Sequence, residues 1–224
     1  MKKSVIFCAI FCVVIAWSSA GYAVDMTGKL GVGIDGGLLI PAGGDMTADS
    51  SFSDFFGSGI DFGAHINYGI IPELSLQAGF RYSFFKMDDE ANGDPDNEPY
   101  LNTPQVYLDA ILNLASFFNN PDNAFNPYVK AGAGIYFWKI TEDGVGGDAI
   151  ELGNGDDLSK TSLGINFGLG VEYFATPNVS IFAEGLYDYI FTKDEDKFGD
   201  DFSNLGDIGI RLGFSYYFPI GSGE

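Results

Sequence analysis

The sequence predicts an all-β protein, an eight-stranded antiparallel up-and-down β-barrel that spans a membrane. Three observations support this prediction. Eight segments alternate apolar and polar residues with period two, one face of every segment lacks charged side chains, and long and short connections alternate. The composition agrees, because 31 glycines and 16% aromatic residues in 224 residues favour strands over helices.

Residues 1–23 are expected to lie outside this fold as a secretory signal peptide, which leaves residues 24–224 as the barrel domain. A pair of lysines precedes 13 consecutive apolar residues, too few to cross a bilayer as a helix. Small residues predict cleavage after Ala23, with Ala20 as the alternative. Both cysteines fall within this segment, so the mature chain is expected to have no disulfide and no thiol chemistry.

The charge balance argues against nucleic acid as a partner. The chain has 31 acidic and 11 basic residues and a net charge of −20. Loss of the signal peptide removes two lysines and no acids, which changes the net charge to −22. A surface that binds a nucleic acid backbone needs clustered positive charge instead.

Eight strands are expected, at residues 28–40, 58–69, 73–86, 103–116, 126–140, 161–175, 178–192 and 205–218. On each strand, one alternate set of residues is apolar, and its only hydroxyl groups belong to tyrosines. The opposite set is polar. It contains Asp35, Asp61, His65, Asn67, Gln77, Arg81, Asp109, Asn113, Lys130, Asn166, Glu172, Glu184, Asp188, Asp207 and Arg211.

This division fits either a soluble barrel with an apolar core or a membrane barrel whose apolar set faces lipid. The membrane barrel is favoured because the polar set is spaced by Gly, Ser and Asn, whereas a water-facing set would be rich in Lys and Glu. Aromatic residues also gather near strand ends, as interfacial girdles require. They are Tyr68, Phe84, Phe85, Phe117, Phe118, Phe125, Tyr128, Phe137, Trp138, Tyr173, Phe174, Tyr189, Phe191, Tyr216, Tyr217 and Phe218.

The connections predict an acidic outer surface. Short or medium links at 70–72, 117–125 and 176–178 would be periplasmic turns, and both termini would be periplasmic. Long links at 41–57, 87–102, 141–160 and 193–204 would be extracellular, and they hold 20 of the 31 acids. A solvated surface is expected. Divalent cations are the alternative, with candidate ligands Asp94, Asp96, Glu98, Asp194 and Asp196, because hard cations prefer carboxylate oxygens.

Buried ion pairs are expected inside the barrel. Seven acids of the polar set face three cations, and unpaired burial of charge is costly. We therefore expect Arg81 and Arg211 each to bridge two or more carboxylates. The network would comprise Arg81, Lys130, Arg211, Asp109, Glu172, Glu184 and Asp188. Because eight strands enclose little more than their own side chains, a plugged interior is expected, with a thin cation-preferring water path as the alternative.

No motif for catalysis or for a cofactor is found in the sequence. Nucleophile, Walker and zinc-binding spacings are absent. The single histidine, His65, is expected in the lumen beside a carboxylate. A lipid-modifying enzyme that uses His65 is a third hypothesis, after a non-catalytic surface protein and a small channel.

Three segments resemble the small outer-membrane β-barrel family around the OmpA transmembrane domain, OmpX and OmpW. They are residues 126–136 (NPYVKAGAGIY), 176–184 (TPNVSIFAE) and 211–218 (RLGFSYYF). The last is similar to the C-terminal signal that the barrel assembly machinery recognises, with Gly213, Tyr216 and Phe218 at its defining positions. Most family members end at this phenylalanine, whereas here Pro219 to Glu224 follow.

The resemblance implies an integral protein of a Gram-negative outer membrane, in contact with lipid, lipopolysaccharide and the assembly machinery. The role expected is structural or surface-interacting and non-catalytic, with an OmpW-like channel for small solutes as the alternative. A monomer is expected, because barrel closure leaves no strand edge to pair.

Overall fold

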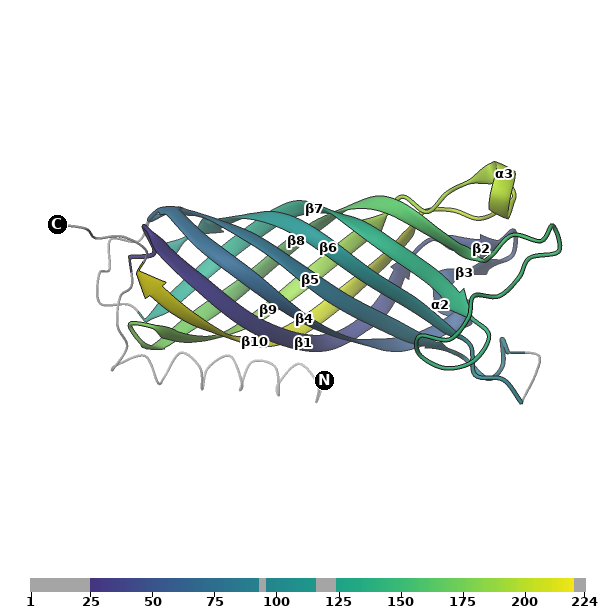
Figure 1. The fold of residues 1–224 in the computed structure, drawn as a ribbon, viewed down its shortest axis with the longest axis horizontal. Helices are drawn as coiled ribbons and strands as arrows, with labels where there is room; N and C mark the ends of the chain where they lie inside the picture. Colours follow the sequence, from purple (N-terminus) through teal and green to yellow (C-terminus); the bar gives the residue numbers. More distant parts are fainter. Residues whose placement is uncertain (1–24, 93–95, 116–123, 220–224) are drawn as a thin grey trace, which may run out of the picture.

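The computed structural model describes residues 25–92, 96–115 and 124–219, and its main feature is a closed antiparallel barrel (Figure 1). Eight strands form it: β1 (Lys29–Gly43), β4 (Phe56–Ile71), β5 (Leu74–Met87), β6 (Tyr100–Asn113), β7 (Phe125–Thr141), β8 (Ser159–Thr176), β9 (Val179–Ile190) and β10 (Leu205–Pro219). Each pairs with its neighbours in sequence, and β1 closes the barrel against β10. The predicted eight-stranded up-and-down barrel is confirmed. The predicted signal peptide lies outside the described residues.

The long connections carry small elements that the sequence did not predict. The first holds β2 (Asp45–Thr47), β3 (Ser50–Ser51) and α2 (Phe52–Phe55), and the last holds α3 (Glu195–Phe198). These segments are too short to show a hydrophobic period. In the described part of the chain, no helix is long and apolar enough to cross a membrane.

One predicted strand is shifted. The strand expected at 103–116 runs from Tyr100 to Asn113, and hydrogen bonds hold Asn113 at its end. The backbone N–H of Asn113 donates to the carbonyl of Glu73, and the side-chain amide of Asn113 donates to Ser75 Oγ at 3.1 Å. These bonds bind the end of β6 to the neighbouring β4–β5 turn.

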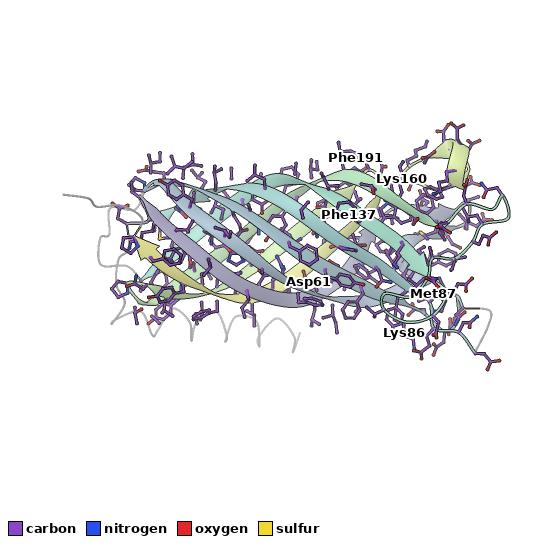
Figure 2. All side chains as sticks on the ribbon, viewed as in Figure 1. Asp61, Lys86, Met87, Phe137, Lys160 and Phe191 are labelled. Atoms are coloured by element: carbon purple, nitrogen blue, oxygen red, sulfur yellow. The ribbon has the colours of Figure 1, made fainter. Side chains whose placement is uncertain are left out.

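The apolar residue set faces outward and the polar set faces the lumen. Leu38, Leu169 and Leu212 have 66%, 69% and 66% of their surface exposed on the outside of the barrel. Figure 2 shows side chains that project outward around the strands. Arg81, Asp109 and Asn166 are fully buried in the lumen. A soluble barrel would show the opposite arrangement, so the outer face is suited to lipid.

The prediction that the strand-end aromatic residues form girdles is wrong for several of them. Phe137, Phe191 and Tyr216 are exposed on the outer face. Five others point into the barrel and are buried, because adjacent residues of a strand face opposite sides. They are Phe85, Tyr128, Trp138, Phe174 and Tyr217. Phe117 and Phe118 lie outside the described residues.

Candidate functional site in the closed lumen

The barrel interior is filled in layers along its axis. At the loop end lies an apolar cluster, here called the apolar cap. It consists of Leu39, Phe52, Phe56, Phe85, Leu101, Tyr136, Trp138, Ile140, Ile190, Phe202 and Leu205. Below it lies a network of charged and hydroxyl side chains, here called the polar middle. At the turn end, Met26 packs with Phe174 and Tyr217.

The loops contribute directly to the apolar cap. Phe52 of α2 packs edge-to-face on Phe56 and Phe85, with ring centroids 5.5 Å and 5.4 Å apart. Asp54 accepts hydrogen bonds from the backbone N–H and hydroxyl of Ser51, which fix the start of α2 and lower the pKa of the Asp54 carboxyl. The first loop is thus folded onto the barrel mouth.

The last loop adds a second aromatic contact. Phe202 stacks on Trp138 with centroids 5.7 Å apart, and Phe198 of α3 lies 5.3 Å from the same indole. Trp138 Nε1 donates to Ser162 Oγ at 3.1 Å, so the one polar atom of this side chain is satisfied. Loops that are distant in sequence therefore meet over one lumen.

Arg211 is the centre of the polar middle. Its Nη2 donates to Asp35 Oδ1, and its Nε lies 2.9 Å from Asp61 Oδ2. A third carboxylate is reached through Nη1, which donates to Glu184 Oε1 at 3.3 Å. One guanidinium, 1% exposed, thus contacts carboxylates from β1, β4 and β9.

Arg81 of β5 forms a second centre, which shares Asp61 with Arg211. Its Nη1 donates to Asp188 Oδ2 at 2.8 Å, and its Nε lies 3.7 Å from Asp61 Oδ2. The guanidinium also lies over the ring of Tyr107, 4.9 Å from the centroid. Tyr136 donates to the other oxygen of Asp188 at 2.6 Å, so both oxygens of this carboxylate are bonded.

Lys130 joins the remaining acids. Its Nζ lies 2.8 Å from Glu184 Oε1 and 3.5 Å from Asp109 Oδ2. Tyr128 donates to the second oxygen of Glu184 at 2.9 Å. Glu184 therefore contacts Lys130, Arg211 and Tyr128, which makes it the carboxylate with the most partners in the network.

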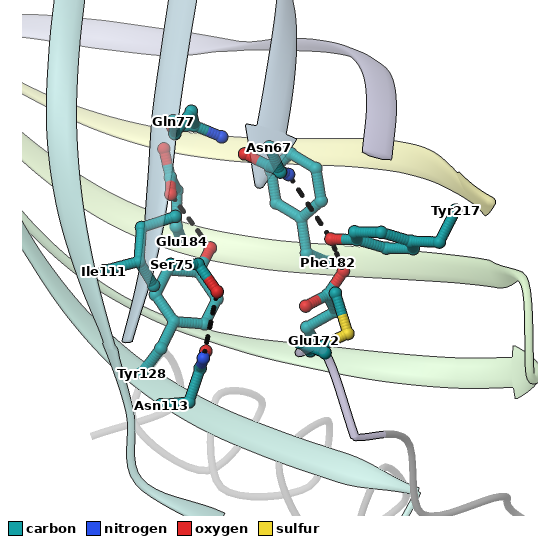
Figure 3. A pocket seen from close by; sticks show the side chains of 11 residues that line it. Asn67, Ser75, Gln77, Ile111, Asn113, Tyr128, Glu172, Phe182, Glu184 and Tyr217 are labelled. Carbon is teal, nitrogen blue, oxygen red and sulfur yellow. Dashed lines mark hydrogen bonds between the residues drawn. The ribbon is translucent and has the colours of Figure 1, made fainter. Parts of the chain in front are cut away.

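Met26, Glu172 and Glu184 line a cavity of about 30 Å³, which is large enough for ordered water. Figure 3 shows Glu172 and Glu184 on its wall. Glu172, on its wall, accepts hydrogen bonds from Ser180 at 2.5 Å and from Tyr217 at 2.7 Å. Asn67 also borders the cavity, and its Oδ1 has no hydrogen-bond partner within the described residues. The polar wall is suited to ordered water.

His65 lies between an acid and a hydroxyl. Its Nδ1 is 2.9 Å from Asp35 Oδ2, and its Nε2 is 3.2 Å from Ser215 Oγ. Gly33 sits on the strand between His65 and Ser215, opposite both. A Cβ on Gly33 would strike the imidazole and prevent this contact.

Asp35, His65 and Ser215 are connected in the same order as the acid, base and nucleophile of a hydrolase triad. Solvent and substrate, however, do not reach His65 and Ser215. His65 is 3% exposed and Ser215 is fully buried. Neither residue lines the cavity described above, and Asp35 is also bound by Arg211. Because the side chains of His65 and Ser215 are buried, this arrangement is suited to holding β1, β4 and β10 together.

The candidate cation ligands do not form a cluster. Glu98 pairs with Lys86 at 3.1 Å, and Asp194 pairs with Lys160 at 3.2 Å. In the described ranges, no three His, Cys, Asp or Glu side chains gather in a way that could hold a metal ion. Asp94 lies outside those ranges, and Asp96 and Asp196 belong to different loops.

The residues of the C-terminal signal lie on β10, next to β1. Tyr216 and Phe218 face outward, with ring centroids 6.2 Å apart. Gly213 has a structural role as well, because the Phe182 ring covers the space that a Cβ would need. The tail 220–224 lies outside the described residues.

Sequence reasoning missed the hydroxyl groups of the network. The phenols of Tyr128, Tyr136 and Tyr217 each donate to a buried carboxylate. A usable signal existed, since these tyrosines share the strand parity of the polar set. The girdle prediction includes Tyr128 and Tyr217, because it gives proximity to strand ends more weight than parity, and it does not consider Tyr136.

Comparison with known proteins gives one family and a set of similar structures. The model of the outer membrane protein beta-barrel domain matches residues 9–218. No curated protein sequence matches the chain. Neisserial surface protein A is similar in structure, with a TM-score of 0.54 and 18% identity over 85% of this chain and 99% of that chain. So is Ail, the attachment invasion locus protein of Yersinia pestis, with a TM-score of 0.50 and 15% identity over 86% and 100%. At these identities, the likeness shows the fold alone.

Proposed function

The chain belongs to the family of outer membrane protein beta-barrel domains, and from that premise we propose that it is a closed, non-catalytic barrel whose function resides in its extracellular loops. Its role is structural or surface-interacting. Four acidic loops are held above the outer leaflet, and the barrel serves as their anchor.

The observation that carries this proposal is the filled interior. The apolar cap covers one end, and the polar middle contains Arg81 and Arg211, which are at most 1% exposed. The cavity near Met26 has a volume of about 30 Å³ and is suited to ordered water. A filled lumen of this kind favours a role as an anchor for the loops over a role in transport.

The apolar cap links the barrel to the loops. Phe52, Phe198 and Phe202 come from two different loops and pack over one mouth. Because these side chains fix the bases of the first and last loops, these two loops have a defined shape before any partner binds. Preorganisation of this kind lowers the entropic cost of binding.

A small-solute channel of the OmpW kind is the second candidate, and the ion-paired lumen weighs against it. A lipid-modifying enzyme is the third. It would need Ser215 or His65 to reach a lipid, and both are buried.

Export and assembly complete the proposal. A signal peptide cleaved after Ala23 or Ala20 would deliver the chain to the periplasm, and the barrel assembly machinery would recognise Gly213, Tyr216 and Phe218. Closure pairs β1 with β10, which leaves no free edge and favours a monomer.

The topology can be tested with trypsin on intact cells that express the full chain. Lys193 and Lys197 lie in the last loop, near α3. If this loop is extracellular, external trypsin cuts there, and the fragments stay together in cold SDS but separate on boiling. Protection in intact cells with cleavage after the outer membrane is opened would contradict the proposed orientation.

A further inference from the structure

Three of the strands that run toward the loops end in the same outward-facing pair, a phenylalanine followed two residues later by a lysine. The pairs are Phe84 and Lys86 on β5, Phe137 and Lys139 on β7, and Phe191 and Lys193 just beyond β9. Phe137 and Phe191 are 45% and 44% exposed on the outer face. Figure 2 shows Phe137 and Phe191 nearer the barrel middle, and Lys86 nearer the loops.

This pairing matches the boundary of an outer leaflet. Aromatic side chains mark the level where acyl chains meet head groups. Two residues along a tilted strand advance about 5 Å along the membrane normal. The three ammonium groups therefore lie one step above the aromatic level, where lipid head groups carry their phosphates.

The distribution of positive charge supports a specific use of these lysines. After Lys2 and Lys3, the sequence has nine cations, of which Arg81, Lys130 and Arg211 are in the lumen. Lys29 begins β1 at the turn end. The remaining five all lie at the loop end: Lys86, Lys139, Lys160, Lys193 and Lys197. A protein with net charge −20 thus keeps nearly all its outer positive charge at the loop end of the barrel.

The present partners of Lys86 and Lys193 leave them available, whereas Lys139 Nζ already donates to the carbonyls of Gly147 at 2.6 Å and Gly146 at 3.4 Å, which leaves one of its three N–H groups for a phosphate. Lys86 pairs with Glu98 and Lys193 with Glu195, at 3.1 Å and 2.7 Å, and all four side chains are 44–60% exposed. Exposed pairs of this kind contribute little free energy, so a phosphate can replace the carboxylate. The bond to Glu195 raises the pKa of Lys193, which keeps the ammonium charged at neutral pH.

We infer that the lysines at the ends of β5, β7 and β9 form a one-sided binding surface for phosphorylated lipid head groups of the outer leaflet. It is here called the lysine rim: Lys86, Lys139 and Lys193. The fourth strand that runs toward the loops, β1, ends in Ile40 and Ala42 on its outer face and has no such pair. The lipid contact is therefore restricted to the arc from β5 to β9. This inference rests on the proposed outer-membrane orientation.

The test uses the full chain folded in phosphatidylcholine vesicles that contain a small fraction of fluorescently labelled diphosphorylated lipid A. In a Trp17→Phe background, Trp138 is the only tryptophan, and it is adjacent to Lys139. Energy transfer from Trp138 to the labelled lipid then reports how much phosphorylated lipid gathers at the lysine rim. A dephosphorylated lipid A probe supplies the reference.

The decisive variant is the double Lys86→Gln and Lys193→Gln, and the matched control is the double Lys29→Gln and Lys197→Gln. Both remove two positive charges. A lysine near an anionic lipid surface contributes about fivefold in affinity, so the rim double loses about 25-fold preference for the phosphorylated probe. The control double keeps most of it, and Lys→Arg changes at the rim restore it.

Three results would overturn the inference. The first is an equal loss in both doubles. The second is a preference that survives in the rim double and depends on Mg²⁺, since acidic loops would then bind phosphate through the cation. The third is complete competition by inorganic phosphate, which would indicate a site for free anions. If the proposed orientation were wrong, the trypsin experiment on intact cells would show it, and the energy-transfer result in vesicles would not change.

Discussion

In the polar middle, Arg211, Arg81 and Lys130 hold buried carboxylates by ion pairs, whereas in the apolar cap phenylalanine, leucine and tryptophan side chains pack with hardly a polar atom. The two regions lie in one lumen and both exclude solvent. They differ in how they respond to change. A charged network fails when one member is lost, because its partners stay buried without compensation. An apolar cluster loses only the contacts and volume that are removed.

The largest effect is expected from Arg211→Met. The change leaves Asp35, Asp61 and Glu184 without their shared cation, so the free energy of unfolding should fall by about 3–5 kcal/mol. Urea unfolding of the vesicle-folded protein measures it. Arg211→Lys, which keeps the charge but not the planar fork, should lose less. A methionine variant as stable as the wild type would show that the network does not hold the polar middle together.

The apolar cap should respond in a graded way. Phe202→Ala removes a buried ring that stacks on Trp138 and should cost about 3 kcal/mol. Phe202→Leu should recover more than half of that loss, because apolar packing tolerates approximate shape. The same unfolding assay compares them, and Val145→Ala, which changes an exposed loop residue, serves as the control. If Phe202→Ala and Phe202→Leu lowered the free energy of unfolding equally, the apolar cap would not respond in a graded way, and it would not differ from the polar middle in this respect.

A smaller effect is expected from Ser215→Ala. The change deletes the hydrogen bond to His65 Nε2 and should cost about 1 kcal/mol. Lipid-hydrolase assays on the wild type and the variant should both remain at background, since Ser215 is fully buried. Hydrolysis by the wild type that the variant abolishes would show that the Asp35, His65 and Ser215 series is catalytic.

The smallest effect should come from the loop base. Hydrogen bonds from Ser51 lower the pKa of Asp54, so their stabilisation is present above the unfolded pKa and is lost as the pH falls through the folded one. Asp54→Asn should therefore speed amide exchange in residues 51–55 at neutral pH and remove its acid dependence. Global unfolding should hardly change. Unaltered exchange would show that the apolar cap alone orders α2.

The sequence was sufficient to predict the barrel, its strands and the division of its faces, because period two repeats over eight segments and each depends only on local order. It could not predict which lumen residues meet. Gly33 lies opposite both His65 and Ser215, and this follows from the register of β1 with β4 and β10. Register across distant strands is set by the whole closed barrel.

The apolar cap was missed for a related reason. Phe52 and Phe202 come from segments with no periodic pattern, so nothing in their local sequence indicates burial. Only the closed barrel brings the two loops over one mouth. The inward tyrosines Tyr128, Tyr136 and Tyr217 differ, since their parity is visible in the sequence and already places them with the polar set.

The central claim is that the lumen is closed, and single-protein conductance in planar bilayers tests it most directly. The wild-type chain should insert without conductance steps. The double Phe52→Ala and Phe202→Ala should also give none, because the polar middle still fills the barrel beneath the weakened cap. Reproducible ohmic steps from the wild type would contradict the closed interior and favour a channel for small solutes.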